Sequence, residues 1–323
     1  MKKNENGGML RMGGFYSALP TPLRDDGGPD FASLDALIEF LIEKGVEGFC
    51  GGGLTGEYPI FGAEDRIQVY RHIAKRTAGR ASLIFGVGSE NSSQVLKMAA
   101  EAKDLGAVAL LLPPPSFFHV APIDVQEMMG QIASSLPLPV ILYFIPQFVK
   151  SLGVSNVLTL LGSVENIVGV KDSSGNVEAL EQYASAKRAM GFRLMAGNDN
   201  LLLDALKSQA DGCISGLSSM APELMLGLYR AFYQGASQRA AELQSLVKEL
   251  ATAMSSLPVT WGIKIALDAQ GFPMGSLSWP CGPRLAARIA RFRQWYEQWT
   301  PSVRERLVAS SNSSQIIQHS LRN

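Results

Sequence analysis

Eight short apolar runs, each a candidate β-strand, alternate with longer segments of helical periodicity through most of the chain. The apolar runs occupy residues 14–19, 46–50, 82–86, 107–112, 139–143, 167–171, 192–196 and 212–214. Repeated strand–helix units imply parallel strands joined by right-handed crossovers. Eight units within about 200 residues are typical of a TIM (β/α)8 barrel rather than an open doubly wound sheet. The sequence therefore predicts an α/β fold, a TIM barrel with a C-terminal helical extension.

The same pattern divides the chain into four regions. Residues 1–12 are predicted to form a flexible N-terminal tail, and residues 13–219 the (β/α)8 barrel. Residues 220–300 are expected to form the helical extension because apolar residues recur at helical spacing there, and residues 301–323 a polar tail.

Charge and cysteine content argue against several classes of function. The 29 Lys and Arg residues balance the 29 Asp and Glu residues, so neither nucleic acid nor an anionic membrane surface is expected as a partner. Three widely spaced cysteines predict a reducing, cytoplasmic location without disulfides, and the cysteines and histidines lack the spacing of a metal site. No apolar run reaches the roughly 18 residues of a membrane-spanning helix.

The strand expected at 167–171 ends in Lys171, and a polar loop at 172–175 follows at once. An ammonium group at the end of a buried strand is costly unless it is paired or neutral. Burial lowers the pKa of a lysine, and a neutral amine is a nucleophile toward ketones. One interpretation is that Lys171 forms a Schiff base with a 2-oxo acid. The alternative is a strand-end lysine that extends into solvent.

Other chemically useful residues also fall at strand ends, where the catalytic groups of TIM barrels lie. Tyr143 ends the strand before that of Lys171, so both side chains are expected at the same mouth of the barrel. A phenol beside the amine suits imine chemistry because a carbinolamine needs a proton carrier. Alternatively, Tyr143 is an ordinary rim residue. The glycine-rich loop 51–56 offers amide groups and the Thr55 hydroxyl to a carboxylate, or is simply a tight turn.

The loop 51–56 also matches the dinucleotide-binding pattern G-x-G-x-x-G. Pro59 interrupts the helix that should follow, and no Asp or Glu closes the next expected strand, where a ribose contact would lie. We therefore set aside a dinucleotide-dependent oxidoreductase.

Several motifs occur in the order and spacing of a known enzyme family. They are Ala18-Leu-Pro-Thr-Pro22, Gly53-Leu-Thr-Gly-Glu57 followed by Glu64, Tyr143-x-x-Pro146, Ile167-Val-Gly-Val-Lys-Asp-Ser-Ser-Gly175, Ala196-Gly-Asn-Asp199 and Gly262-Ile-Lys-Ile-Ala-Leu267. Through them the chain resembles the dihydrodipicolinate synthase/N-acetylneuraminate lyase family of class I pyruvate-dependent lyases.

The resemblance implies a TIM barrel with C-terminal helices that assembles as a homotetramer, a dimer of dimers. It implies that Lys171 forms a Schiff base with pyruvate or another 2-oxo acid, that Tyr143 moves protons, and that an aldehyde is the second substrate. The substrate contacts are expected to come from Leu54, Thr55, Gly56, Phe148, Gly197 and Ile214. Neither a metal ion nor an organic cofactor is implied.

The sequence departs from this family where a hydroxyl or a charge would be expected. Leu54 replaces a Thr or Ser of many members, and Phe118 falls near the position of a relay tyrosine from the neighbouring subunit. Phe148 replaces the arginine with which the synthases grip a carboxylated aldehyde, and Phe144 replaces an asparagine. An apolar wall at Phe144 and Phe148 suits a less polar aldehyde. Lys150, an exposed loop lysine, is not expected to restore the charge.

The sequence supports three functional hypotheses. The first is a lyase of the aldolase or dehydratase type, which makes or breaks a C–C bond through an imine at Lys171. The second is dihydrodipicolinate synthase (4-hydroxy-tetrahydrodipicolinate synthase), which condenses pyruvate with aspartate semialdehyde. The third is a non-catalytic sensor of a 2-oxo acid, which the missing hydroxyl partners of Tyr143 motivate.

Overall fold

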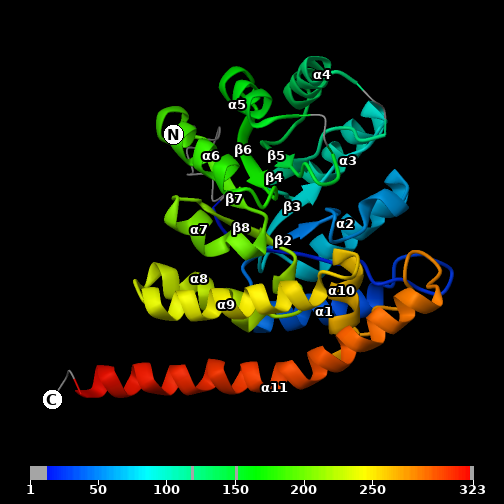
Figure 1. Ribbon diagram of the computed structural model, residues 1–323. Helices are drawn as coiled ribbons and strands as arrows, with labels where there is room; N and C mark the ends of the chain where they lie inside the picture. Colours follow the sequence, from blue (N-terminus) through cyan, green and yellow to red (C-terminus); the bar gives the residue numbers. More distant parts are fainter. Residues whose placement is uncertain (1–12, 118–119, 150–151, 321–323) are drawn as a thin grey trace.

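Eight parallel strands close into a barrel in which each strand pairs with its neighbours in chain order and β8 pairs with β1 (Figure 1). The computed structural model describes residues 13–117, 120–149 and 152–320, with side chains as far as Leu307. The predicted TIM barrel is therefore confirmed. The strands are β1 (Gly14–Ala18), β2 (Gly48–Gly51), β3 (Ser82–Gly86), β4 (Ala109–Leu112), β5 (Val140–Phe144), β6 (Ile167–Asp172), β7 (Arg193–Ala196) and β8 (Gly212–Ser215).

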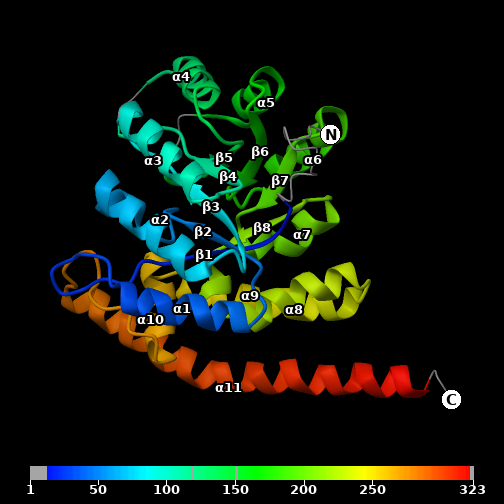
Figure 2. The ribbon, with the colours of Figure 1, turned by 180° about the vertical axis from the view of Figure 1, so that it is seen from behind.

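A helix follows each strand on the outside of the barrel (Figure 2). These helices are α1 (Phe31–Glu43), α2 (Ala63–Thr77), α3 (Ser92–Asp104), α4 (Pro122–Ser134), α5 (Val154–Ser163), α6 (Val177–Met190), α7 (Leu202–Lys207) and α8 (Pro222–Tyr233). Short 3₁₀ turns lie in the loops after β2, β7 and β8, namely η1 (Tyr58–Ile60), η2 (Asp199–Leu201) and η3 (Leu217–Ser219).

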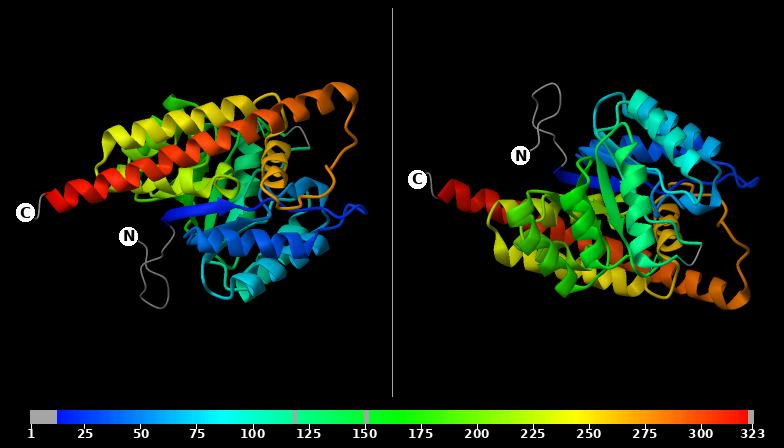
Figure 3. Two further views of the ribbon diagram at one scale, coloured as in Figure 1. Left: turned by 90° about the horizontal axis from the view of Figure 1, so that it is seen from below. Right: turned by 90° about the horizontal axis from the view of Figure 1, so that it is seen from above.

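The C-terminal helices α9 (Ser237–Met254), α10 (Val259–Ala269) and α11 (Pro283–Ser320) cover one side of the barrel (Figure 3). The far end of α11 extends beyond the rest of the molecule. α11 crosses the boundary expected at residue 300 without a break, and Pro301 lies inside it. A proline removes one backbone hydrogen bond and often bends a helix, but it does not always end one. The tail predicted at 1–12 lies outside the described residues.

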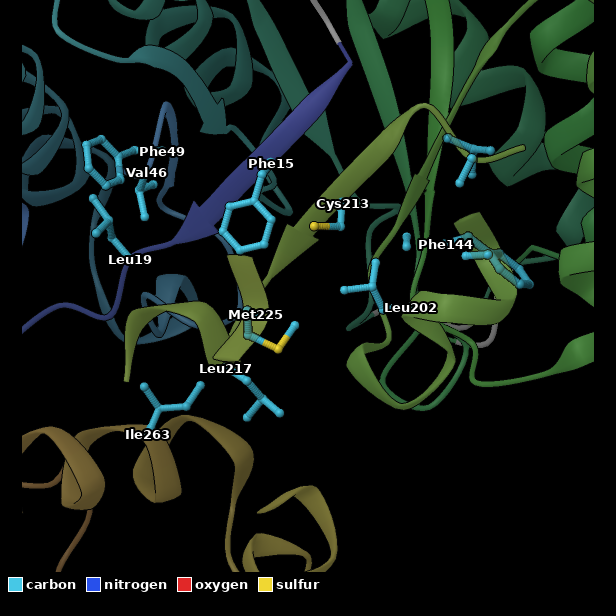
Figure 4. Close-up of a cluster of buried hydrophobic side chains, with 14 of the residues drawn as sticks. Phe15, Leu19, Val46, Phe49, Phe144, Leu202, Cys213, Leu217, Met225 and Ile263 are labelled. Carbon is cyan, nitrogen blue, oxygen red and sulfur yellow. The ribbon is translucent and has the colours of Figure 1, made fainter. Parts of the chain in front are cut away.

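Side chains of the strands alternate between the barrel interior and the layer beneath the helices. Tyr16, Cys50 and Ile214 belong to the interior cluster. Phe15 points outward into the larger core, which also holds side chains of η3, α8 and α10 (Figure 4). Because both faces of every strand are buried, the strands read as nearly continuous apolar runs, which is why the sequence pattern locates them.

Local sequence signals fix most helix bounds. In α1, Asp30 is the N-cap and accepts the amides of Ala32 and Ser33 at 3.0 and 3.2 Å. The apolar positions at helical spacing are the buried ones, namely Leu34, Leu37, Ile38 and Leu41. The pattern therefore predicts both the start of this helix and its buried face.

The segment after β7 is not one continuous helix. It forms η2 and then the short α7. The side chain of Gln244, on α9, donates to the carbonyls of Asp199 and Asn200 at 3.0 and 3.2 Å. This contact satisfies carbonyl groups of the first turn, and it comes from a residue far away in the sequence, so a local pattern cannot indicate it.

Within the described residues, no single helix is long and apolar enough to cross a membrane. The pair α9 and α10, bent by 105°, passes that length and composition criterion only when its two helices are taken together. The same residues contain no group of three or more His, Cys, Asp and Glu side chains arranged to hold a metal ion.

Candidate active site

Lys171 and Tyr143 lie side by side at the carboxyl end of the barrel. They are register partners on the adjacent strands β5 and β6, and both residues are only 5% exposed. The Nζ atom of Lys171 lies 4.2 Å from the centroid of the Tyr143 ring. The alternative of a lysine that extends into solvent is therefore wrong, and the amine has a phenol as its immediate neighbour.

Gly197, the first residue after β7, makes room for the stem of Lys171. A Cβ atom at Gly197 would lie 2.8 Å from Cε and 2.9 Å from Cγ of Lys171. Carbon atoms that are not bonded do not approach so closely in a packed interior, so a larger residue would displace the lysine. Gly197 thus contributes to the site through the absence of a side chain.

The loop after β2 presents Thr55 to the same space. The amides of Gly56 and Glu57 donate within the loop, to the carbonyls of Gly53 at 3.1 Å and Leu54 at 2.8 Å. The amides of Leu54 and Thr55 have no acceptor among the described residues. These two amides and the Thr55 hydroxyl are therefore the groups of the loop that can meet a carboxylate.

A cavity of about 400 Å³ opens at this end of the barrel. Its polar side includes Ser173 and Asn198, and its apolar side includes Met254, at the end of α9, and Leu257, in the turn between α9 and α10. The cavity brings together six of the eight predicted site residues, Leu54, Thr55, Tyr143, Phe148, Lys171 and Gly197. It brings an amine, a phenol and a hydroxyl together in one cavity.

Two of the predicted substrate contacts are not part of the cavity lining. Ile214 is fully buried in the interior cluster of the barrel, because its position on β8 points it inward among other strand side chains. Gly56 has no side chain to offer, and its carbonyl accepts the Thr21 hydroxyl at 3.0 Å. The structure therefore does not place either residue where it would contact a molecule in the cavity.

Phe144 does not form the apolar wall expected of it. Its ring packs outward against Tyr183 of α6, with ring centroids 5.7 Å apart. Successive residues of a strand point to opposite faces, so Phe144 must face away from the barrel interior when Tyr143 faces it. Phe118 and Lys150, which also entered the sequence argument, lie outside the described residues.

Asp199 is a cavity residue to which the sequence analysis assigns no role. Its Oδ2 atom accepts the amide of Leu217 at 3.1 Å. Burial raises the pKa of the Asp199 carboxyl, and hydrogen bonds from Ser215 and Leu217 and the charge of Lys171 oppose that rise. The strand-end rule could have found this residue, because it follows β7 closely within the quoted motif. Asp199 can accept a substrate hydroxyl or exchange a proton.

The raised pKa of Asp199 leads to a pH-dependent prediction. Between the ordinary carboxyl pKa and the raised folded value, the folded protein holds a proton that the unfolded chain has released, so stability falls as pH rises. Asp199→Asn lacks this titration. As pH rises through that window, its free energy of unfolding is expected to increase relative to that of the wild type by up to about 1.4 kcal/mol per pH unit. Urea unfolding at a series of pH values from the ordinary carboxyl pKa upward measures the gain.

Asp30→Asn is a control for which the opposite pH dependence of stability is expected. The hydrogen bond from the Ser33 side chain, together with the amides of Ser33 and Ala32, holds the pKa of Asp30 below its ordinary value. The stabilisation from Asp30 is therefore present above the unfolded pKa and lost as pH falls through the folded pKa. The free energy of unfolding of Asp30→Asn should therefore decrease relative to that of the wild type as pH rises. The same trend in Asp199→Asn would contradict the direction given for Asp199.

The dihydrodipicolinate synthetase family matches residues 11–292 of this chain. The chain belongs to that family. Across 279 residues it is 29% identical to 4-hydroxy-tetrahydrodipicolinate synthase of Bacillus subtilis, covering 85% of this chain and 94% of the relative. It is also 29% identical, over 276 residues, to the Escherichia coli protein named probable 2-dehydro-3-deoxy-D-pentonate aldolase YjhH, covering 84% and 92%.

A solved structure of the dihydrodipicolinate synthetase family is similar over nearly its whole length. YagE, a prophage protein from Escherichia coli K12 crystallised in complex with pyruvate, has a TM-score of 0.83 and 28% identity, covering 89% of this chain and 98% of YagE. The family resemblance inferred from the motifs is thus confirmed, and the chain is a class I pyruvate-dependent lyase. These relatives are named as synthases and aldolases, so they lend no support to the sensor hypothesis. The rest of α11 after residue 292 lies beyond the family match.

Proposed function

We propose that Lys171 forms a Schiff base with pyruvate or another 2-oxo acid, and that the enzyme makes or breaks a C–C bond between that acid and an uncharged aldehyde. The observation that carries the proposal is the buried amine of Lys171 in the cavity lining, 4.2 Å from the centre of the Tyr143 ring. An amine in that position has a proton carrier beside it and carboxylate-binding groups at Thr55 within the same cavity.

The chemistry runs in balanced steps. The neutral amine of Lys171 attacks the C2 carbonyl carbon of the acid, and the carbinolamine loses water to give an imine. The imine loses a proton from C3 to give an enamine, whose C3 bonds to the aldehyde carbon. Hydrolysis then releases the product and the lysine, and cleavage is the reverse. Tyr143 transfers protons at the carbinolamine and aldehyde oxygens, while Thr55 and the adjoining amides hold the carboxylate.

The charge of the cavity supports an aldehyde without a carboxylate. Among the described lining residues, Lys171 is the only cation and Asp199 the only anion. The nitrogen of Lys171 is bonded to the 2-oxo acid once the imine forms, so the described lining offers no second cation to a carboxylate on the aldehyde. Asn198 and Asp199 suit hydroxyl groups near the reacting carbon, and Met254 and Leu257 suit an apolar end of the molecule.

Borohydride reduction in the presence of pyruvate tests the proposal. Reduction of the imine fixes the acid to the lysine, and mass spectrometry of the digested protein locates the added mass. A panel of polyhydroxylated aldehydes, aromatic aldehydes and aspartate semialdehyde, given with pyruvate to the unreduced enzyme, then reports which of them is consumed. An adduct on a lysine other than Lys171, or none with any 2-oxo acid, would defeat the assignment. Efficient use of aspartate semialdehyde would favour the synthase hypothesis, which the similarity to the Bacillus subtilis enzyme motivates.

Phe148→Arg is expected to change the preference among aldehydes. Phe148 lines the cavity and is 60% exposed, so an arginine there can reach the cavity without disturbing the core. A guanidinium binds a carboxylate through two parallel hydrogen bonds. We expect kcat/KM for aspartate semialdehyde to rise about tenfold and that for an uncharged aldehyde to fall. Phe148→Met removes the ring without adding charge, and an equal gain in that variant would argue against a charge effect.

We also propose that the enzyme is a cytoplasmic homotetramer, a dimer of dimers. Large apolar side chains are exposed at Phe117, Ile123 and Met128 around the start of α4, and at Val177 and Met190 on α6. Exposed apolar side chains on separate helices are the kind of surface that subunit contacts bury. The cysteines are free, which fits a reducing compartment. Sedimentation equilibrium is expected to give a tetramer, and a monomer at all concentrations would contradict this assembly.

A further inference from the structure

A buried ion pair lies directly behind the loop that presents Thr55. The Nζ atom of Lys264, on α10, contacts Oε2 of Glu57, and their side chains are 1% and 5% exposed. The hydroxyl of Ser278 donates to Oε1 of Glu57 at 2.7 Å, and Nε1 of Trp261 donates to the same oxygen at 3.2 Å. An ammonium group and two neutral donors thus converge on one buried carboxylate.

The backbone of Glu57 is in the left-handed region, with φ 55° and ψ 38°. Residues other than glycine rarely adopt this conformation, and it persists where surrounding contacts determine it. Glu57 is two residues from Thr55, and its amide donates to the carbonyl of Leu54 at 2.8 Å. The anchored carboxylate therefore fixes the residue that closes the turn containing both free amides of the loop.

The helix α10 also meets this loop from the cavity side. Ile263, the residue before Lys264, lines the cavity. A Cβ atom at Gly216 would lie 3.2 Å both from Cδ1 of Ile263 and from Oγ1 of Thr55, so these two side chains flank the same narrow space. Of two consecutive residues of α10, Ile263 thus faces Thr55 across the space at Gly216, and Lys264 contacts Glu57.

We propose that Glu57 and Lys264 are positioning residues that hold Thr55 and the adjoining amides in the geometry that binds the substrate carboxylate. The inference rests on the proposed function, in which this loop binds the 2-oxo acid. Burying two opposite charges costs solvation energy that their attraction often only balances, so such a pair is a poor device for stability alone. The ion pair does, however, fix the position of the Glu57 side chain, and it connects the turn of the loop to α10. Ser278 links the same carboxylate to the segment between α10 and α11.

The proposal predicts a change in pyruvate affinity that is separate from any loss of stability. Glu57→Gln and Lys264→Met each leave one buried charge unpaired, so both are expected to lower the melting temperature. Both should also raise the pyruvate concentration for half-maximal borohydride trapping about tenfold. The double variant buries no unpaired charge. It is expected to recover the melting temperature while the half-maximal concentration stays high, which a purely structural role does not predict.

Ser278→Ala decides the question if the buried variants do not fold. It removes one neutral donor to Glu57 at the edge of the cluster, and it is expected to raise the half-maximal pyruvate concentration about threefold. Lys44→Met is the matched control for Lys264→Met. It also breaks an ion pair, with Glu223 at 2.5 Å, but that pair is partly exposed and joins α1 to α8. That variant should trap pyruvate like the wild type.

Two outcomes would overturn the positioning role. One is a double variant that recovers both the melting temperature and the wild-type half-maximal concentration, and the other is a Ser278→Ala variant with wild-type trapping. If the wild-type enzyme itself forms no adduct with pyruvate, the proposed function fails instead. The two failures are thus distinguishable within one set of measurements.

Discussion

Lys171→Met is expected to lower kcat by about 10⁴-fold or more, because it removes the nucleophile that forms the imine. Methionine keeps the unbranched stem that occupies the space beside Gly197, so the fold and the shape of the cavity should persist. The checks are steady-state kinetics with the aldehyde that the wild type uses best, and mass spectrometry after borohydride treatment with pyruvate. No adduct is expected in this variant.

Lys187→Met is the control for this substitution. Lys187 lies on α6, and its Nζ atom is 2.9 Å from Oδ2 of Asp211, away from the cavity. It should retain both the activity and the adduct. Equal melting temperatures of Lys171→Met and the wild type would show that lost activity is not lost folding. An undiminished adduct in Lys171→Met would mean that a different amine carries the chemistry.

The barrel and the position of Lys171 could be predicted from the sequence because both depend on local patterns. Strands buried on both faces carry continuous apolar runs, so the run at 167–171 locates β6 without knowledge of its partners. The rule that TIM-barrel chemistry lies at strand ends then selects Lys171 and Tyr143. The same rule selects Asp199, whose importance depends on burial, a property that the motif alone does not indicate.

The apolar wall of the cavity could not be predicted, because it depends on packing between distant segments. Met254 is the last residue of α9 and Leu257 lies in the turn before α10, and the docking of these helices onto the barrel brings both side chains to the cavity. The pair of Glu57 and Lys264 is hidden in the same way, since neither residue stands near the other in the sequence. Phe144 shows another limit, because a shift of one residue in a strand reverses the face of a side chain.

Tyr143→Phe is expected to lower kcat by about 10²–10⁴-fold while leaving the imine-forming lysine in place. The substitution removes only a hydroxyl, and the ring that lies 4.2 Å from Nζ of Lys171 stays. Loss of the proton carrier slows both dehydration of the carbinolamine and proton transfer at the aldehyde oxygen. The amine itself still attacks the ketone, so borohydride should trap the adduct at Lys171, but more slowly. The rates of trapping and of turnover measure the two effects.

Tyr16→Phe is the matched control, because Tyr16 belongs to the same interior cluster but is not part of the cavity lining. It should keep the wild-type kcat. The hydroxyl of Tyr143 has no hydrogen-bond partner among the described residues, so it is available to exchange its proton with substrate or water. If Tyr143→Phe also kept the wild-type kcat, Asp199 would be the proton carrier to test, as the other acid in the described lining. Adding Asp199→Asn to Tyr143→Phe should then remove the activity that Tyr143→Phe retains.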